Sequence, residues 1–260
     1  MTLLNKVPQV TIFFWVIKIL ATTVGETAAD FLSTTLHFGL VVTSYVMSAL
    51  FVIVLIVQLT RKRYIRSIYW TVVVLISVVG TLVSDMLVDK LGIGLRTSSI
   101  IFGCILGVVF LVWWLSERTL SVHAVNTTRR ELFYWAAILF TFALGTSGGD
   151  LAAETFGLGY PLSALMFAGL IALTAAAYYY LKVDGVLAFW IAYILTRPLG
   201  ASTGDFLSQP VASGGLGLGT TTTSFVFLAI IVSLVTFLAR TRRDEIAWDD
   251  VGDEVRRKAA

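Results

Sequence analysis

The sequence is poor in charge, in histidine and in cysteine. Charged residues make up 13% of its 260 positions and apolar residues 57%, a balance that excludes an ordinary water-soluble domain. The single cysteine, Cys104, excludes an internal disulfide. The two histidines, His37 and His123, show no metal-site spacing. Zinc and copper, which prefer imidazole or thiolate ligands, are therefore not expected.

Recognisable catalytic groupings are also missing. No Ser/His/Asp set and no thiol with a partner base stands out, so the sequence favours a protein that is not an enzyme and carries no cofactor. The net charge of +3 gives no support for nucleic-acid binding, because the lysines and arginines gather in short loops between apolar runs.

Long apolar runs are what the sequence has in abundance. A membrane-spanning helix needs about 20 mostly apolar residues, and eight segments meet this requirement. They are approximately 9–32, 38–60, 68–89, 97–116, 132–153, 160–181, 186–207 and 220–240. The predicted fold class is an all-α integral membrane protein, with the lipid bilayer as its principal partner.

Lysine and arginine mark one side of this predicted bundle. The loops after the second, fourth, sixth and eighth segments carry the basic residues Arg61, Lys62, Arg63, Arg66, Arg118, Arg129, Arg130, Lys182, Arg240, Arg242 and Arg243. The opposite loops hold Lys90 and Arg96. Because basic loops are retained in the cytoplasm, we expect a bacterial cytoplasmic (inner) membrane protein with both termini cytoplasmic.

A landmark set recurs four times along the chain. An aromatic pair ending in tryptophan is followed ten residues later by glycine and five residues after that by aspartate. The sets are Trp15/Gly25/Asp30, Trp70/Gly80/Asp85, Trp135/Gly145/Asp150 and Trp190/Gly200/Asp205. A glycine and a hydroxyl residue follow each set: Gly39/Thr43, Gly94/Ser98, Gly159/Ser163 and, after an insertion within 209–219, Gly219/Thr223.

These landmarks predict one transmembrane domain, 1–243, followed by a short cytoplasmic tail, 244–260. The domain would contain four two-helix repeats, at about 9–60, 68–116, 132–181 and 186–240. Two helices return the chain to its starting side, so the repeats share one orientation and should be related by a rotation about the membrane normal. The first helix of each repeat carries nearly all the intramembrane charge, and we expect these four helices to form an inner ring.

The remaining landmarks have ordinary structural interpretations. We expect the tryptophans to anchor helix ends at the membrane interface. We expect the glycines to be notches that let helices approach closely. Faces rich in small residues would also allow a homo-oligomer.

Carboxylates inside the apolar runs form the candidate site, because Asp and Glu are costly in hydrocarbon and by default suggest function there. Tryptophan to aspartate is 15 residues, about 22 Å of a core about 30 Å thick, so the aspartates lie in the outer part of the membrane. Residues four apart share a helix face and add further carboxylates. The predicted metal-binding set is Glu26, Asp30, Asp85, Asp89, Asp150, Glu154 and Asp205.

Two basic residues, Lys18 and Arg197, also lie inside the apolar runs. They would either pair with carboxylates across helices as structural ion pairs or serve as charge-coupling groups that displace an ion during transport. The surrounding ligands are oxygen-rich, which suits hard ions such as Mg²⁺, Ca²⁺ or Mn²⁺, and protons are the other natural passenger.

The segment from about Val7 to Arg243 resembles a bacterial family of uncharacterised multi-pass "membrane-anchored" proteins. The stretches that carry the resemblance are FFWVIKILATTVGETAADFLS, YWTVVVLISVVGTLVSD, FYWAAILFTFALGTSGGDLAAE and FWIAYILTRPLGASTGDFLSQP. More loosely, the pairs Gly-Glu at 25–26 and Gly-Asp at 149–150 and 204–205 are similar to the acidic motifs of cation exchangers that export Mn²⁺ or Ca²⁺. Those families carry Glu-x-Gly-Asp-Lys/Arg-Thr/Ser twice, and this chain departs from that pattern.

The sequence therefore favours a secondary transporter for a hard cation, with proton-coupled export of a divalent metal such as Mn²⁺ as the first hypothesis. The alternative is a non-transporting membrane sensor or assembly module, in which buried charges pair internally and the tail contacts a partner. The identity of the ion, the direction and the stoichiometry stay open.

Overall fold

The structure is a computed structural model that describes residues 5–244. It contains eight long helices, and the described residues include no strand. The helices are α1 (Ile12–Asp30), α2 (Leu40–Thr60), α3 (Arg66–Asp85), α4 (Leu95–Glu117), α5 (Thr128–Asp150), α6 (Gly159–Leu181), α7 (Gly185–Ser208) and α8 (Thr220–Thr241). All eight are long and apolar enough to span a bilayer. The protein is a multi-pass helical membrane protein, as predicted. Of the predicted tail, the structure describes Asp244.

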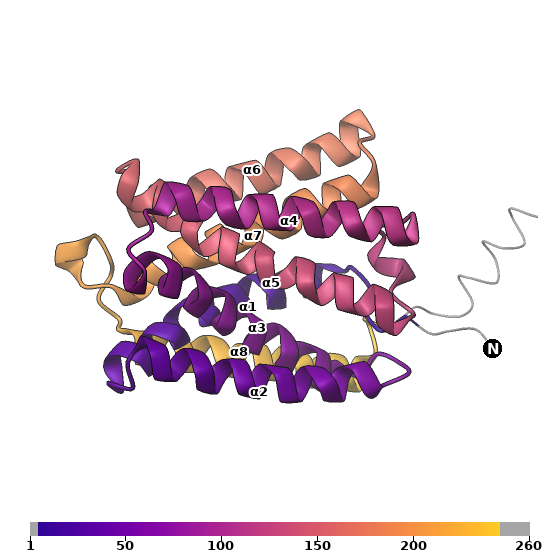
Figure 1. The fold of residues 1–260 in the computed structure, drawn as a ribbon, viewed down its shortest axis with the longest axis horizontal. Helices are drawn as coiled ribbons and strands as arrows, with labels where there is room; N and C mark the ends of the chain where they lie inside the picture. Colours follow the sequence, from indigo (N-terminus) through magenta and orange to yellow (C-terminus); the bar gives the residue numbers. More distant parts are fainter. Residues whose placement is uncertain (1–4, 245–260) are drawn as a thin grey trace, which may run out of the picture.

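The odd-numbered helices form an inner ring, as predicted. In α1, α3, α5 and α7, between 56% and 61% of an 18-residue apolar stretch is buried inside the bundle. The corresponding share is 11–22% in the even-numbered helices. Within the ring, α1 packs against α3 and α7, and α5 packs against the same two helices. Helices α1 and α5 therefore lie across the ring from each other. Figure 1 shows the helices running side by side, with α6 along the upper edge of the bundle and α2 along the lower edge.

Each outer helix covers the inner helix of the following repeat. Helix α2 packs on α3, α4 on α5 and α6 on α7, and α8 closes the circle by packing on α1. Hydroxyl pairs strengthen two of these contacts: Ser224 donates to Thr27 Oγ1 at 2.8 Å, and Ser99 donates to Ser147 Oγ at 3.3 Å. The repeats are thus interlocked in one closed assembly.

The repeated glycines let the inner helices approach closely. A Cβ at Gly80 would come within 2.5 Å of the Cβ of Phe142, and a Cβ at Gly200 would collide with Thr22. In the same way Gly25 lies against Ser77, and Gly145 lies against Arg197. In every case the glycine contacts the residue seven positions after the tryptophan of the next inner helix. The interpretation of the glycines as packing notches is confirmed.

Three of the four repeated tryptophans correct a prediction, because they lie inside the bundle, whereas Trp15 is partly exposed. Trp70, Trp135 and Trp190 are only 2–4% exposed, so they are not anchors at the membrane interface. The aromatic residue before each tryptophan packs on the tryptophan of the neighbouring inner helix, with ring centroids 5.5–6.3 Å apart. These pairs are Phe14/Trp70, Tyr69/Trp135, Tyr134/Trp190 and Phe189/Trp15. They form a continuous aromatic layer, which is favourable because the tilted rings bury large areas against one another.

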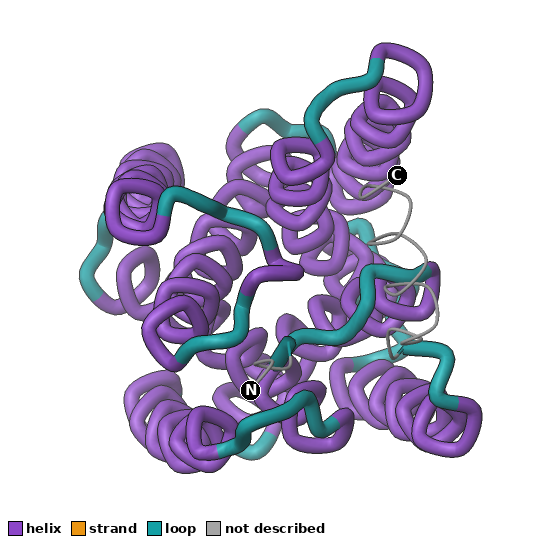
Figure 2. Tube along the Cα trace, turned by 90° about the vertical axis from the view of Figure 1, so that its right-hand side faces the viewer, coloured by secondary structure: helices purple, strands orange, loops and turns teal. Residues whose placement is uncertain are grey.

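Two segments cover this aromatic end of the bundle: the loop between α4 and α5, and the N-terminal segment. Both ends of the described chain also lie here, and we call this end the terminal end below. Figure 2 views it and shows the loop with the short helix η3 (Val122–Ala124) reaching over the centre. The N-terminal segment crosses this loop: Lys6 N donates to Val125 O at 3.0 Å. Lys6 Nζ also forms a buried ion pair of 2.6 Å with Glu131, which accepts a second hydrogen bond from Gln58.

The end of α8 is fixed at the same place. Asp244 accepts hydrogen bonds from Tyr64 Oη at 2.9 Å and Arg66 Nε at 2.6 Å, while its carbonyl oxygen accepts from Gln9 N. Burial, reinforced by the Asp244 carboxylate, raises the pKa of Tyr64 well above its usual value, so the hydroxyl remains a donor. The terminal end is therefore closed by ion pairs as well as by aromatic rings.

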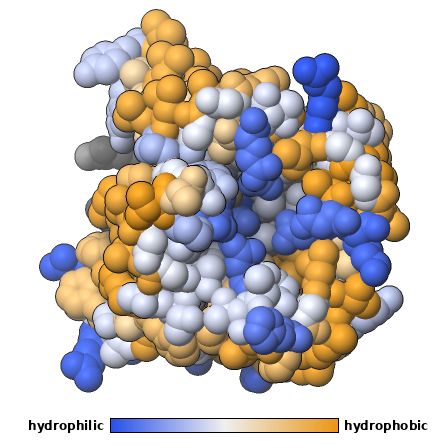
Figure 3. Space-filling view, turned by 90° about the vertical axis from the view of Figure 1, so that its left-hand side faces the viewer, coloured by the Kyte–Doolittle hydropathy of each residue, from blue (hydrophilic) through white to orange (hydrophobic). Residues whose placement is uncertain are grey.

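The opposite end, called the acidic end below, is built differently. Directly after Asp30, Asp85 and Asp150 the helix widens into a π-helical turn, η1 (Phe31–Thr35), η2 (Met86–Lys90) and η4 (Leu151–Thr155). The fourth repeat lacks this turn. Its insertion folds back through η5 (Val211–Ser213) and donates backbone hydrogen bonds to carbonyls at the end of α7. Figure 3 shows hydrophilic residues gathered around a hollow in the middle of this face.

Candidate functional site

The inner helices stack equivalent residues in layers along the ring. Counted from the tryptophan, positions +3, +7, +11 and +15 lie on one face because they are four apart. From the terminal end, the layers are Lys18/Val73/Ile138/Tyr193, Thr22/Ser77/Phe142/Arg197, Glu26/Thr81/Thr146/Ala201 and Asp30/Asp85/Asp150/Asp205. Both basic residues are in the two layers nearer the terminal end, and the acidic residues are in the two layers nearer the acidic end.

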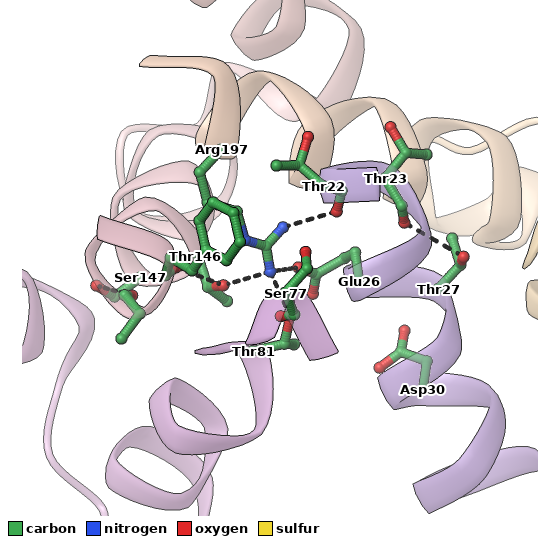
Figure 4. A network of polar contacts seen from close by, with 12 residues as sticks. Thr22, Thr23, Glu26, Thr27, Asp30, Ser77, Thr81, Thr146, Ser147 and Arg197 are labelled. Carbon is green, nitrogen blue, oxygen red and sulfur yellow. Dashed lines mark hydrogen bonds and ion pairs between the residues drawn. The ribbon is translucent and has the colours of Figure 1, made fainter. Parts of the chain in front are cut away.

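Arg197 lies at the centre and contacts all the other inner helices (Figure 4). Its side chain is 0% exposed. The guanidinium donates to Thr22 O on α1 at 3.0 Å, to Thr81 Oγ1 on α3, and to Thr146 Oγ1 on α5 at 2.8 Å. Because α3 lies across the ring from α7, only a side chain that points into the ring can reach Thr81 from α7.

The same guanidinium forms an ion pair with Glu26, at 3.0 Å between Nη2 and Oε2. Glu26 is 6% exposed and also lies 3.5 Å from Thr81 Oγ1. The predicted pairing across helices therefore occurs, and Arg197 takes Glu26 as its partner. Separating these two charges would leave either one unpaired in a poorly solvated site.

Lys18 lies one layer deeper. Its ammonium donates to Tyr193 O at 3.0 Å and to Thr196 Oγ1, both on α7. It also lies 3.6 Å from the centre of the Tyr193 ring and 5.2 Å from that of Phe142 on α5. Contact with α5, across the ring from α1, places the ammonium inside the ring.

The four repeated aspartates lie at the acidic end. Asp30, Asp85 and Asp150 are partly exposed, and Asp205 is 7% exposed. The aspartates are close enough to one another and to Glu26 for electrostatic interaction. Asp85 interacts with Glu26 and Asp30, and Asp205 interacts with Asp30 and Asp150. Gln209 Nε2 donates to Asp30 Oδ2 at 3.4 Å and links the ends of α7 and α1. The aspartates place four carboxyl groups in a mouth above the Arg197–Glu26 pair.

The other two members of the predicted set, Asp89 and Glu154, are exposed on the π-helical turns. They lie at the rim, where their charges still reach the layer of aspartates. Within residues 5–244, no group of three or more acidic, histidine or cysteine side chains is arranged to hold a metal ion. The predicted residues thus gather toward the acidic end of the inner ring, and Glu26 is engaged by arginine.

One known protein family matches all four repeats of the chain. A family described as Repeat of Unknown Function (DUF347) matches residues 13–64, 68–119, 133–184 and 188–244. The chain belongs to the DUF347 repeat family. Each DUF347 repeat spans one inner helix and the following outer helix, which agrees with the four two-helix repeats inferred from the tryptophan, glycine and aspartate landmarks.

No curated protein and no solved structure matches the chain. The looser similarity to cation exchangers therefore has no support beyond the short Gly-Glu and Gly-Asp pairs, and the DUF347 match carries no substrate with it.

Several residues of the site were not singled out by sequence reasoning. Tyr193, Thr196 and Phe142 hold the Lys18 ammonium, but in the sequence they look like ordinary helix residues. Alignment of the four repeats on their tryptophans would have placed Tyr193 level with Lys18 and Phe142 level with Arg197. The signal was therefore present in the repeat register.

Proposed function

We propose that this DUF347 protein is a secondary transporter for a hard cation in the bacterial inner membrane. The observation that carries the proposal is the set of four equivalent aspartates at the acidic end of the membrane bundle, in the layer next to the Arg197–Glu26 pair. With both termini cytoplasmic, the acidic end faces outward. A mouth lined by carboxylates concentrates cations through its electrostatic field.

The ligands available to an ion at this mouth favour hard cations. Besides the carboxylates, the inner layers offer hydroxyl groups of Thr81 and Thr146 and backbone carbonyl oxygens. Oxygen ligands suit Mg²⁺, Ca²⁺ and Mn²⁺, and export of a divalent metal such as Mn²⁺ is the form of the proposal we favour.

The two basic side chains inside the ring, Arg197 and Lys18, favour a transport cycle over an open pore. A cation that passes the aspartates would next meet Arg197 and then Lys18, and fixed positive charges inside a membrane protein form a barrier to cations. Below them the aromatic layer closes the terminal end. Passage therefore requires the helices to rearrange, with access alternating between the two ends.

Glu26 gives a route to coupling. It is shared between Arg197 and any cation that reaches its layer, so an arriving ion competes with the guanidinium for the carboxylate. Protons compete for the same oxygens, which would link metal movement to the proton gradient. Because binding of either charge changes the contacts of Arg197 with three other helices, local competition is transmitted to the whole ring.

The test is ion flux in proteoliposomes that hold the purified full-length protein. A metal-sensitive dye and a pH dye report transport of Mn²⁺, Mg²⁺ and Ca²⁺ with and without an imposed proton gradient. We expect saturable flux that is lost in Asp150→Asn and Asp205→Asn. The matched control is Asp184→Asn at the terminal end, where the side chain caps α7 by accepting from Val186 N and Leu187 N and asparagine caps equally well.

Wild-type flux in both aspartate variants, or no flux of any of these ions from folded protein, would contradict the proposal. The second candidate is the non-transporting sensor or assembly module, and it is favoured by the hydrogen bonds of Arg197 to α1, α3 and α5. In that case the charges specify helix packing. Residues 245–260, the contact surface expected for such a module, lie outside the described residues.

A further inference from the structure

The surroundings of Lys18 have the chemistry of a site for an ammonium ion. Two oxygen acceptors, Tyr193 O and Thr196 Oγ1, lie on one side of the nitrogen. The face of the Tyr193 ring lies 3.6 Å away and that of Phe142 5.2 Å away. Aromatic faces attract cations most strongly where water is excluded, and every one of these groups is buried.

The ammonium is held here without a carboxylate. In the described part of the chain Lys18 forms no ion pair, and Glu26, two turns along the same helix, is engaged by Arg197. A buried charge normally requires a partner of opposite sign. At this position carbonyl, hydroxyl and aromatic groups replace that partner, so recognition depends on the positive charge and on the directions of its N–H donors.

We propose that this pocket is a binding site for a primary ammonium and that the lysine of the chain is its tethered ligand. The pocket belongs to α5 and α7, whereas the ligand is supplied by α1. It takes a monovalent, hydrogen-bonding cation on an unbranched alkyl chain. This assignment does not depend on transport, because it concerns how the pocket recognises the ammonium.

Chemical rescue tests the assignment. Lys18→Ala removes three methylene groups and the nitrogen, and n-propylammonium supplies the same atoms as a free ligand. We expect the full-length variant in detergent to melt several degrees below the wild type. Added n-propylammonium chloride should restore the melting temperature with saturation in the millimolar range, as expected for a ligand of only four non-hydrogen atoms.

Two comparisons make the rescue specific. Sodium chloride and 1-propanol at the same concentrations should not restore the melting temperature of Lys18→Ala, since one lacks the alkyl chain and the other lacks the charge. Wild type and Lys18→Met should not respond to n-propylammonium, because their pockets are filled. Equal rescue by 1-propanol, or no rescue of a folded Lys18→Ala protein, would overturn the assignment.

Lys18→Met keeps the proposal testable if Lys18→Ala cannot be purified. Methionine fills nearly the same volume without a charge, so a site for ammonium requires this variant to melt below the wild type. If Lys18→Met melts at the wild-type temperature, the pocket does not need a cation and the assignment fails.

Discussion

The backbone of Gly200 on α7 lies directly against the side chain of Thr22 on α1, and this contact closes the ring of inner helices. A Cβ at position 200 would also come within 3.0 Å of the Thr22 carbonyl carbon, which belongs to the backbone and cannot rotate away. We therefore expect Gly200→Ala to destabilise the protein by about 1–3 kcal/mol through overpacking, measured by thermal unfolding in detergent.

Gly169 provides the control for this variant. It lies exposed on the outer helix α6, and a Cβ there would meet nothing within 4 Å. Gly169→Ala should leave the melting temperature unchanged or raise it slightly, because alanine favours a helix over glycine by about 1 kcal/mol. Equal effects of the two substitutions would show that the ring does not close as described.

The Arg197–Glu26 pair should behave as a strongly coupled unit. Arg197→Met leaves Glu26 buried with no ion-pair partner, and Glu26→Gln leaves the guanidinium without its carboxylate. Removing one partner of a buried pair costs about 3–5 kcal/mol. We expect the double variant to lose clearly less stability than the sum of the two single variants, in a double-mutant cycle followed by chemical or thermal unfolding. Additive losses would mean that the two side chains are not partners in the folded protein.

The aromatic layer at the terminal end predicts a different response from two tryptophans. Trp135 is 2% exposed inside the bundle, while Trp114 on α4 is 45% exposed. We expect Trp135→Ala to cost about 3–5 kcal/mol, as large-to-small substitutions in a core do. Trp114→Ala should cost about 1 kcal/mol or less. If Trp114→Ala were the more damaging change, anchoring at the membrane interface would outweigh the aromatic layer.

Transport should depend on the depth of each carboxylate. Asp205 is nearly buried and lies in the layer above Glu26, whereas Asp89 is exposed at the rim. We expect Asp205→Asn to abolish flux, and Asp89→Asn to weaken only the attraction of cations to the mouth. The second effect should therefore fade at high salt, because exposed charges are screened within about 10 Å at 0.1 M ionic strength. Flux measured at low and high ionic strength checks both expectations.

Repetition made the fold predictable, since the recurring tryptophan, glycine and aspartate located four repeats and their inner helices. The tryptophans themselves were misplaced because a tryptophan at a helix end has the same local sequence whether it faces lipid or a neighbouring ring. The contacts of Lys6 with Glu131, and of Arg66 with Asp244, were also missed. These contacts join residues far apart in the chain, and the repeat pattern of the sequence contains no signal for them. Pairing of Arg197 with Glu26, and not with the aspartate on its own helix, depends on the ring geometry in the same way.

The packing of α8 on α1 means that no repeat is complete by itself. Each inner helix is covered by the outer helix of the preceding repeat, and α1 is covered by α8 of the last repeat. During synthesis α1 enters the membrane without its outer cover, α8, and it stays so until about two hundred further residues have been made. A chain cut short after six helices would keep an open seam that exposes Glu26 and Lys18. Such products should be ready substrates for membrane quality-control proteases, so the circular arrangement makes completion of the chain a condition of its survival.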